Sequence, residues 1–374
     1  MPAWESELRA KFPALRLWTY LNSAGAGPLA FEVARAGGEV YESLLAGGDA
    51  EWEEQNARIE EARHALATLA GCAPEELAFT RNTSHGASLV AQMLWEQGKR
   101  TAVALEDEFP SSTLPFLHRG FDVRFVKSVA GRYRLEDVDA ALAGRDLLVA
   151  SHVLYRTGHA IEPAAFGRVA KAHGADFYLC ATQSLGALQL DFARSGASFL
   201  TGTSHKWLCA GYGAGYLAIR QELHEKLHWP QVGWLSQEHV EEMRNDRLEI
   251  VRRPRALEMG CQPSPSLLAL GAAVRLWLST GPERVERRVR ALTRSLRSKL
   301  RDAGFDAPDA PEEELSGITV VPVAEAGRVV TALAAERIAS TPRGAGVRLA
   351  VHAFNDDRDL ARAVEVLARV AKPV

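Results

Sequence analysis

The stretch TGTSHKWLCAGYGAGYLAIR, residues 201–220, joins two short apolar runs through small and hydroxyl side chains that surround His205 and Lys206. Short apolar runs of this kind predict strands, and a lysine just after a parallel strand lies in the crevice where α/β sheets bind ligands. There, its amine can form an imine with an aldehyde. Taken alone, a lysine is more often a solvated surface residue, and the glycines at 211–215 are typical of a tight turn. The neighbouring segments decide between these alternatives.

Similar apolar runs recur between about residues 75 and 220. They are LAFT (77–80), TAVALE (101–106), DVRFV (122–126), DLLVASHV (146–153), FYLCA (177–181), SFLTG (198–202) and GYLAI (215–219). Several are almost wholly apolar and helical patterns separate some of them, which is typical of a parallel sheet covered on both faces. The clearest helix is expected to begin at Pro163 and end at Gly174. We therefore predict an α/β fold whose large domain spans residues 21–225 and extends to about 280.

The sequence pattern changes beyond about residue 280. An Arg-rich helix with an apolar stripe from Val285 to Leu300 precedes GITVVPV (317–323), a helix near 328–337, GVRLAVH (346–352) and a last helix expected to open at Asn355. This pattern predicts a smaller α+β domain of residues 281–374. We expect residues 1–20 to pack with it, because a chain start that precedes the sheet must be held somewhere.

Composition excludes several classes of function. The 374 residues include 44 Lys plus Arg and 47 Asp plus Glu, a net charge of −3 that lacks the basic footprint of a nucleic-acid binder. The four cysteines form no CxxC pair, and HExxH, Walker and GxSxG patterns are absent, so we predict no metal site. No apolar stretch reaches the ~20 residues of a membrane span, and the N-terminus lacks a signal-peptide pattern. We expect a cytoplasmic protein with reduced thiols.

Eight ordered segments carry a resemblance to a known family. They are YLNSAGAGP (20–28), FTRNTSHGASLVA (79–91), EFPSSTLPF (108–116), VLYRTG (153–158), CATQSLG (180–186), SHKWL (204–208), LEMGC (257–261) and GVRLAVHAFN (346–355). Together they resemble the class V aminotransferases, fold-type I enzymes that depend on pyridoxal phosphate (PLP) and include cysteine desulfurases and isopenicillin N epimerase-like proteins. The resemblance covers nearly the whole chain. It implies a PLP cofactor, an amino acid or amine substrate, and a homodimer.

The resemblance also implies roles for individual residues. Lys206 corresponds to the lysine that forms the Schiff base with PLP. The phosphate would be held by Thr83, Ser84, Thr203 and His205, with Cys261 in the loop that reaches it across the dimer interface. Phe109 would stack on the pyridine ring, Gln183 would bind the ring oxygen and Cys180 would face the ring nitrogen. Arg348 would bind the substrate carboxylate, with Asn22 as a second substrate-binding residue.

Four positions depart from the family pattern. Cys180 stands where an aspartate keeps the pyridine nitrogen protonated, and a thiol performs that task poorly. Ser198, Cys261 and His85 replace a common aspartate, a threonine and an acidic residue. Residues 262–347 contain no cysteine, which argues against the mobile nucleophile of a desulfurase.

These observations favour a PLP-dependent enzyme acting at the α- or β-carbon of its substrate. Because the ring nitrogen lacks its carboxylate, a racemase or lyase reaction is favoured over transamination. One alternative is a catalytically silent relative that keeps the fold as a binding or regulatory module. Another treats Cys180 and Cys261 as a redox pair.

Overall fold

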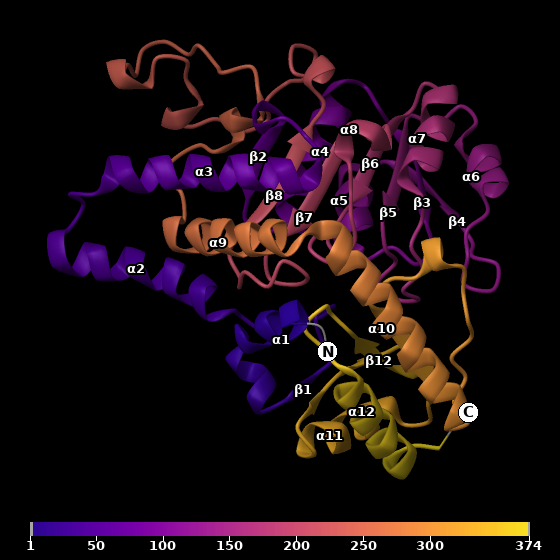
Figure 1. Ribbon diagram of the computed structural model, residues 1–374. Helices are drawn as coiled ribbons and strands as arrows, with labels where there is room; N and C mark the ends of the chain where they lie inside the picture. The colour runs from indigo at the N-terminus through magenta and orange to yellow at the C-terminus, as the bar shows by residue number, and fades with distance from the viewer. Residues whose placement is uncertain (1–2, 373–374) are drawn as a thin grey trace.

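A seven-stranded sheet forms the centre of the protein (Figure 1). The computed structural model describes residues 3–372. The strands are β2 (Leu77–Thr80), β3 (Thr101–Leu105), β4 (Asp122–Val126), β5 (Leu147–Ser151), β6 (Asp176–Cys180), β7 (Phe199–Thr203) and β8 (Gly215–Ile219), in the order β2-β8-β7-β6-β5-β3-β4. β8 is antiparallel to both its neighbours, whereas the other pairs are parallel. The predicted mostly parallel sheet is confirmed, with each apolar run forming a strand.

Both faces of this sheet are buried except at the edge strand β4, as the continuous apolar runs require. In β3, Ala102 and Ala104 join an apolar cluster with α4 (Thr83–Glu96) and α5 (Pro110–Arg119). The alternate residues Val103 and Leu105 join the opposite cluster. The helices on that side are α3 (Trp52–Ala70), α6 (Leu135–Leu142) and α7 (Pro163–Ala172), followed in the chain by the short α8 (Phe192–Ser195). α7 begins at Pro163 as predicted.

Three long helices connect the sheet to the rest of the chain. α9 (Ser264–Thr280) packs against α2 (Phe31–Gly47) and α3, and α10 (Pro282–Asp302) continues from it toward the second unit (Figure 1). The predicted apolar stripe of α10 is buried from Val285 to Leu300. Short 3-10 helices occupy residues 13–16, 74–76, 221–223, 234–236, 240–242, 254–257 and 312–314.

The second unit is an antiparallel sheet of order β11-β12-β9 with helices packed on it, which confirms the predicted α+β character. Its strands are β9 (Ile318–Pro322), β11 (Thr341–Arg343) and β12 (Gly346–Ala350), and its helices include α11 (Ala326–Ala335) and α12 (Asp357–Val370). The chain start contributes α1 (Ala3–Ala10) and β1 (Thr19–Tyr20), which pairs with β10 (Ile338–Ala339). The division at residues 21–225, about 280, 1–20 and 281–374 stays a prediction.

The last helix begins differently from the expectation. Asp356, not Asn355, is its N-cap, because the Asp356 side chain accepts a hydrogen bond from Asp359 N at 3.0 Å. The Asn355 side chain is already engaged, since its Oδ1, the atom that a cap would use, accepts from His352 N at 2.9 Å and its Nδ2 donates to Tyr20 O at 3.1 Å. Within residues 3–372, none of the helices is both long enough and apolar enough to cross a bilayer.

Candidate active site

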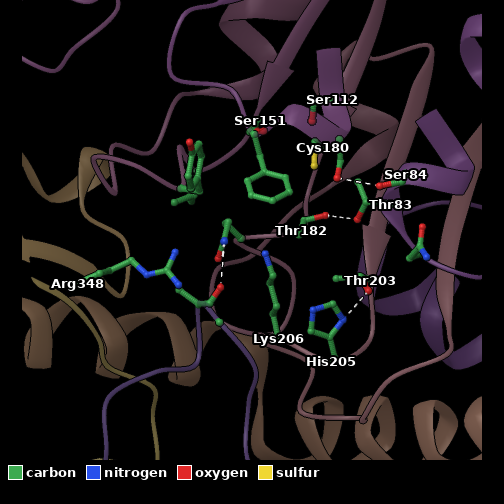
Figure 2. A pocket seen from close by; sticks show the side chains of 18 of the residues that line it. Thr83, Ser84, Ser112, Ser151, Cys180, Thr182, Thr203, His205, Lys206 and Arg348 are labelled. Carbon is green, nitrogen blue, oxygen red and sulfur yellow. Dashed lines mark hydrogen bonds between the residues drawn. The ribbon is translucent and has the colours of Figure 1, made fainter. Parts of the chain in front are cut away.

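A cavity of about 420 Å³ opens at the carboxyl ends of β5, β6 and β7. Side chains from the first turn of α4, the loop after β7 and the β11–β12 hairpin also line it (Figure 2). Nine of the predicted site residues meet here: Thr83, Ser84, Phe109, Cys180, Gln183, Thr203, His205, Lys206 and Arg348. The parallel strands thus deliver residues distant in sequence to a single edge of the sheet.

Lys206 projects its amine into the middle of this cavity (Figure 2). Burial, followed by the positive charge of Arg348, lowers the pKa of Lys206 to about 8, with Arg343 acting in the same direction and Cys180 opposing it. The lysine loop is anchored from outside the sheet, since Gly27 N donates to His205 O at 2.7 Å. A lysine held this way has a substantial neutral, nucleophilic fraction near pH 7.5.

Hydroxyl groups gather at the N-terminus of α4, on the side of the cavity away from Arg348 (Figure 2). Thr83 Oγ1 hydrogen-bonds with Thr182 Oγ1 at 2.6 Å, and Ser84 Oγ donates to Ser111 Oγ at 2.8 Å. The helix N-cap is Asn82, so the first backbone N–H groups of α4 lie beside these hydroxyls. Such an arrangement suits a phosphate dianion.

His205 completes that end of the cavity. Its Nδ1 lies 2.9 Å from Thr203 Oγ1, and its ring stacks on Tyr212 with centroids 4.8 Å apart. Burial and the neighbouring Lys206 lower the pKa of His205 to about 4. The imidazole is therefore neutral at pH 7 and keeps one N–H donor.

The floor of the cavity has a thiol where the resemblance implies a carboxylate. Cys180 is buried, and the β5–β6 register places it opposite Ser151, which also lines the cavity. Behind Ser151, Glu108 accepts from Ser151 N and Ser151 Oγ, both at 2.5 Å. Burial raises the pKa of Glu108 to about 7. No Asp or Glu lines the cavity itself in the described part of the chain.

Gln183 is more constrained than expected. Its Nε2 donates to Ala24 O at 3.2 Å, and its Oε1 accepts from Trp207 Nε1 at 2.8 Å. Only the second N–H of the amide remains for a ligand. Phe109 is 40% exposed at the cavity mouth, with Lys206 Nζ 5.4 Å from its ring centroid.

Arg348 is a buried cation for which residues 3–372 supply no counter-ion. It is 1% exposed, and its Nε and Nη2 have no hydrogen-bond partner among the described residues. Burial, reinforced by Arg343, lowers the pKa of Arg348 to about 10. A guanidinium so placed requires an anionic ligand, because an unpaired buried charge is costly.

Two of the predicted residues do not line this cavity. Cys261 is exposed and lines a second cavity of about 680 Å³ that shares Thr203 and His205 with the first. Asn22 is turned to the β11 strand, where its Oδ1 accepts from Thr341 Oγ1 at 2.5 Å. Cys180 and Cys261 therefore belong to different cavities, and both are free thiols, so the geometry gives no support to a redox pair.

Sequence reasoning missed two side chains of this wall, Tyr155 and Arg343. Tyr155 lies within the VLYRTG motif, so the sequence offered a signal for it. Arg343 carries no sequence signal, because only the hairpin register brings it to the cavity. In the part of the chain that the structure describes, no group of three or more His, Cys, Asp or Glu side chains is arranged to hold a metal ion.

Comparisons with known proteins identify the family of the chain. The family model for Aminotransferase class-V matches residues 19–363. The uncharacterized aminotransferase YcbU of Bacillus subtilis is 25% identical over 97% of each chain, and the isopenicillin N epimerase of Amycolatopsis lactamdurans is 25% identical over 83% of this chain and 84% of its own. A probable cysteine desulfurase of Methanothermobacter thermautotrophicus is 25% identical over 98% of each chain, and the solved cysteine desulfurase of Thermococcus onnurineus has a TM-score of 0.89 and 22% identity over 97% of each chain. The chain belongs to the class V aminotransferase family.

A solved structure shares the fold of this chain. The C-DES protein, in a variant with glycine covalently linked to PLP, has a TM-score of 0.89 and 22% identity over 97% of this chain and 99% of its own. This likeness confirms the fold-type I architecture. Family membership indicates pyridoxal phosphate as the cofactor, and the residues present fit it: a lysine with a lowered pKa, a hydroxyl-lined helix N-terminus and an unpaired arginine share one cavity.

Proposed function

We propose that the protein is a PLP-dependent enzyme that carries its cofactor on Lys206 Nζ and acts at the α- or β-carbon of an amino acid. The observation that carries this proposal is the position of the Lys206 amine, between a hydroxyl-lined helix terminus and the unpaired guanidinium of Arg348 (Figure 2). When bound, PLP supplies an aldehyde that links to amines and a ring that withdraws electrons from the substrate.

The remaining chemistry belongs to this chain's residues. Thr83, Ser84 and Thr203 would hold the phosphate with the neutral His205, and Phe109 would cover one ring face at the mouth. Arg348 would fix the substrate carboxylate by a bidentate contact. That contact orients Cα toward Lys206, whose neutral amine can accept and return a proton there. Gln183 would use its one remaining amide N–H on the ring oxygen.

The class of reaction follows from Cys180. Because a buried thiol stands where a carboxylate would hold the ring nitrogen protonated, we propose epimerisation or elimination in preference to amino transfer. The epimerase relatives support this, as does a match to a probable hercynylcysteine sulfoxide lyase at 27% identity over 74% of this chain. The thiol also supports a second candidate, a catalytically silent binding or regulatory protein.

One experiment separates the two candidates. The purified protein is mixed with PLP, reduced with borohydride and digested, and the pyridoxyl adduct is located by mass spectrometry. We expect it on Lys206, and Lys206→Ala should remove both the adduct and any spectral response to amino acids. The loaded protein is then screened for racemisation, elimination and amino transfer, with Cys180→Asp beside Cys180→Ser as its control. An adduct with no reaction in any of these assays would favour the silent protein, and no adduct would refute the proposal.

We also propose a homodimer in a reducing compartment. Large apolar side chains stand exposed along α2 and beside the second cavity: Phe31, Tyr41, Leu45 and Tyr212. Cys261 lies at that cavity, as expected for a loop completing a partner's phosphate site. Light scattering of the purified protein at a mass of one chain would refute the dimer. The four free thiols support the compartment.

A further inference from the structure

The wall of the cavity that faces Lys206 holds two arginines rather than one. Arg343 and Arg348 come from the two strands of one hairpin, in which Thr341 lies opposite Arg348 and Arg343 opposite Gly346. Side chains two residues apart on a strand share a face. Arg343 is therefore the diagonal neighbour of Arg348 on the cavity face, at a spacing of about 7 Å.

Neither arginine has an anionic partner in the described part of the chain. Among the described residues, neither makes an ion pair, and Arg343 Nε, like Arg348 Nε and Nη2, is buried without a hydrogen bond. Tyr155 fixes the direction of Arg343, whose guanidinium carbon lies 5.4 Å from the centroid of that ring. Both cations therefore present free donors to the same enclosed space.

The cofactor does not account for both charges. The groups suited to its phosphate, Thr83, Ser84 and Thr203, lie on the opposite side of the cavity from Arg348 (Figure 2). One substrate carboxylate satisfies one guanidinium, and the other would then stay unpaired in a cavity lined by no Asp or Glu in residues 3–372. Arg343 is partly exposed, and its guanidinium can form a bidentate contact with a second anion on the ligand.

We propose that the substrate is a dicarboxylic amino acid, whose α-carboxylate binds Arg348 and whose side-chain carboxylate binds Arg343. This inference rests on the proposed function and assigns Arg343 as its specificity-determining residue. The two arginines start from neighbouring strands at a backbone spacing of about 7 Å, so their long side chains can contact the two ends of one small ligand such as aspartate or glutamate.

The test compares charged and neutral isosteres on the PLP-loaded protein. Dissociation constants are measured by calorimetry and by the change in cofactor absorbance, for aspartate against asparagine and glutamate against glutamine. We expect the acid of at least one pair to bind about 10- to 100-fold more tightly. Arg343→Gln should abolish that preference and leave the neutral ligand unchanged, and Arg343→Lys should retain part of it. Arg156→Gln, which removes an exposed arginine next to Tyr155, should change neither constant.

The outcomes separate the two proposals. Failure to trap the cofactor on Lys206 refutes the proposed function, and the dicarboxylate inference falls with it. A trapped cofactor with equal binding of both members of each pair refutes only the inference. If Arg343→Gln weakens the binding of every amino acid equally, the inference is also refuted, because both arginines then bind the same carboxylate. Thermal unfolding of each variant checks that the hairpin is intact.

Discussion

The Lys206 amine should titrate far below an ordinary lysine, and Arg348 should be part of the reason. With its pKa at about 8, about a quarter of the amine is neutral at pH 7.5, whereas about one part in a thousand is neutral at the usual 10.5, a difference of about 200-fold. Replacing Arg348 with Gln removes a positive neighbour, so the protonated lysine becomes more favourable. The pKa must then rise, and the neutral fraction at pH 7.5 must fall.

The assay is competitive acylation of the cofactor-free protein with acetic anhydride between pH 6 and 11, followed by peptide mass mapping. The exposed Lys127 in the same digest serves as the internal reference. The wild-type Lys206 should reach half of its maximal reactivity near pH 8, and Arg348→Gln should move that midpoint upward. A wild-type midpoint at or above 10 would refute the electrostatic account of the cavity. An unchanged midpoint in Arg348→Gln would refute the contribution of Arg348 to the lowered pKa of Lys206.

Three further changes test the surroundings of the site. The pKa of Glu108 is about 7 in the folded protein and near 4.5 in the unfolded chain, so its carboxyl favours folding at low pH and this contribution is lost as the pH rises through 7. In urea unfolding between pH 4.5 and 8, the free energy of unfolding of the wild type should therefore fall by up to about 3 kcal/mol more than that of Glu108→Gln. A Cβ on Gly27 would overlap the carbonyl oxygen of the reactive lysine, so Gly27→Ala should lower Tm and slow cofactor capture, whereas Gly38→Ala, with open space around it, should do neither. Arg63→Met leaves the buried carboxylate of Glu258 without its partner and should lower the free energy of unfolding, measured by chemical denaturation, by about 3–5 kcal/mol. A double variant that also replaces Glu258 with Leu should regain most of that stability.

The strands were predictable because their signal is local. Apolar runs such as LAFT and DVRFV predict strands from their own residues. Strand direction is not local, and nothing in GYLAI distinguishes the antiparallel β8 from its parallel neighbours. The start of the last helix was misjudged because Asn355 and Asp356 are equally good caps by type. The residue types do not show that Asn355 Oδ1 is taken by His352 N, which leaves Asp356 to cap the helix.

The site residues likewise fall into those that sequence motifs predict and those that only the tertiary structure brings together. Lys206, His205 and Thr83 sit in motifs whose spelling carries the family resemblance, and the structure brings them to one cavity. Arg343 sits in a turn-like TPRGAG stretch, and its role emerges only from the pairing of that stretch with the strand of Arg348. The engagement of Gln183 by Trp207 likewise depends on tertiary packing.

The pairing of β1 with β10 ties together parts of the chain that leave the ribosome far apart in time. The strands that carry the lysine side of the cavity are complete once residue 219 has been made, whereas residues 19–20 wait for their partners at 338–339. Contacts so distant in sequence slow folding, and chains tend to fold from the N-terminal side as they emerge. The wall of Arg343 and Arg348 is therefore the last part of the cavity to leave the ribosome. A chain cleaved near residue 310 would keep Lys206 but lose Arg343 and Arg348, the two residues proposed to bind the substrate carboxylates.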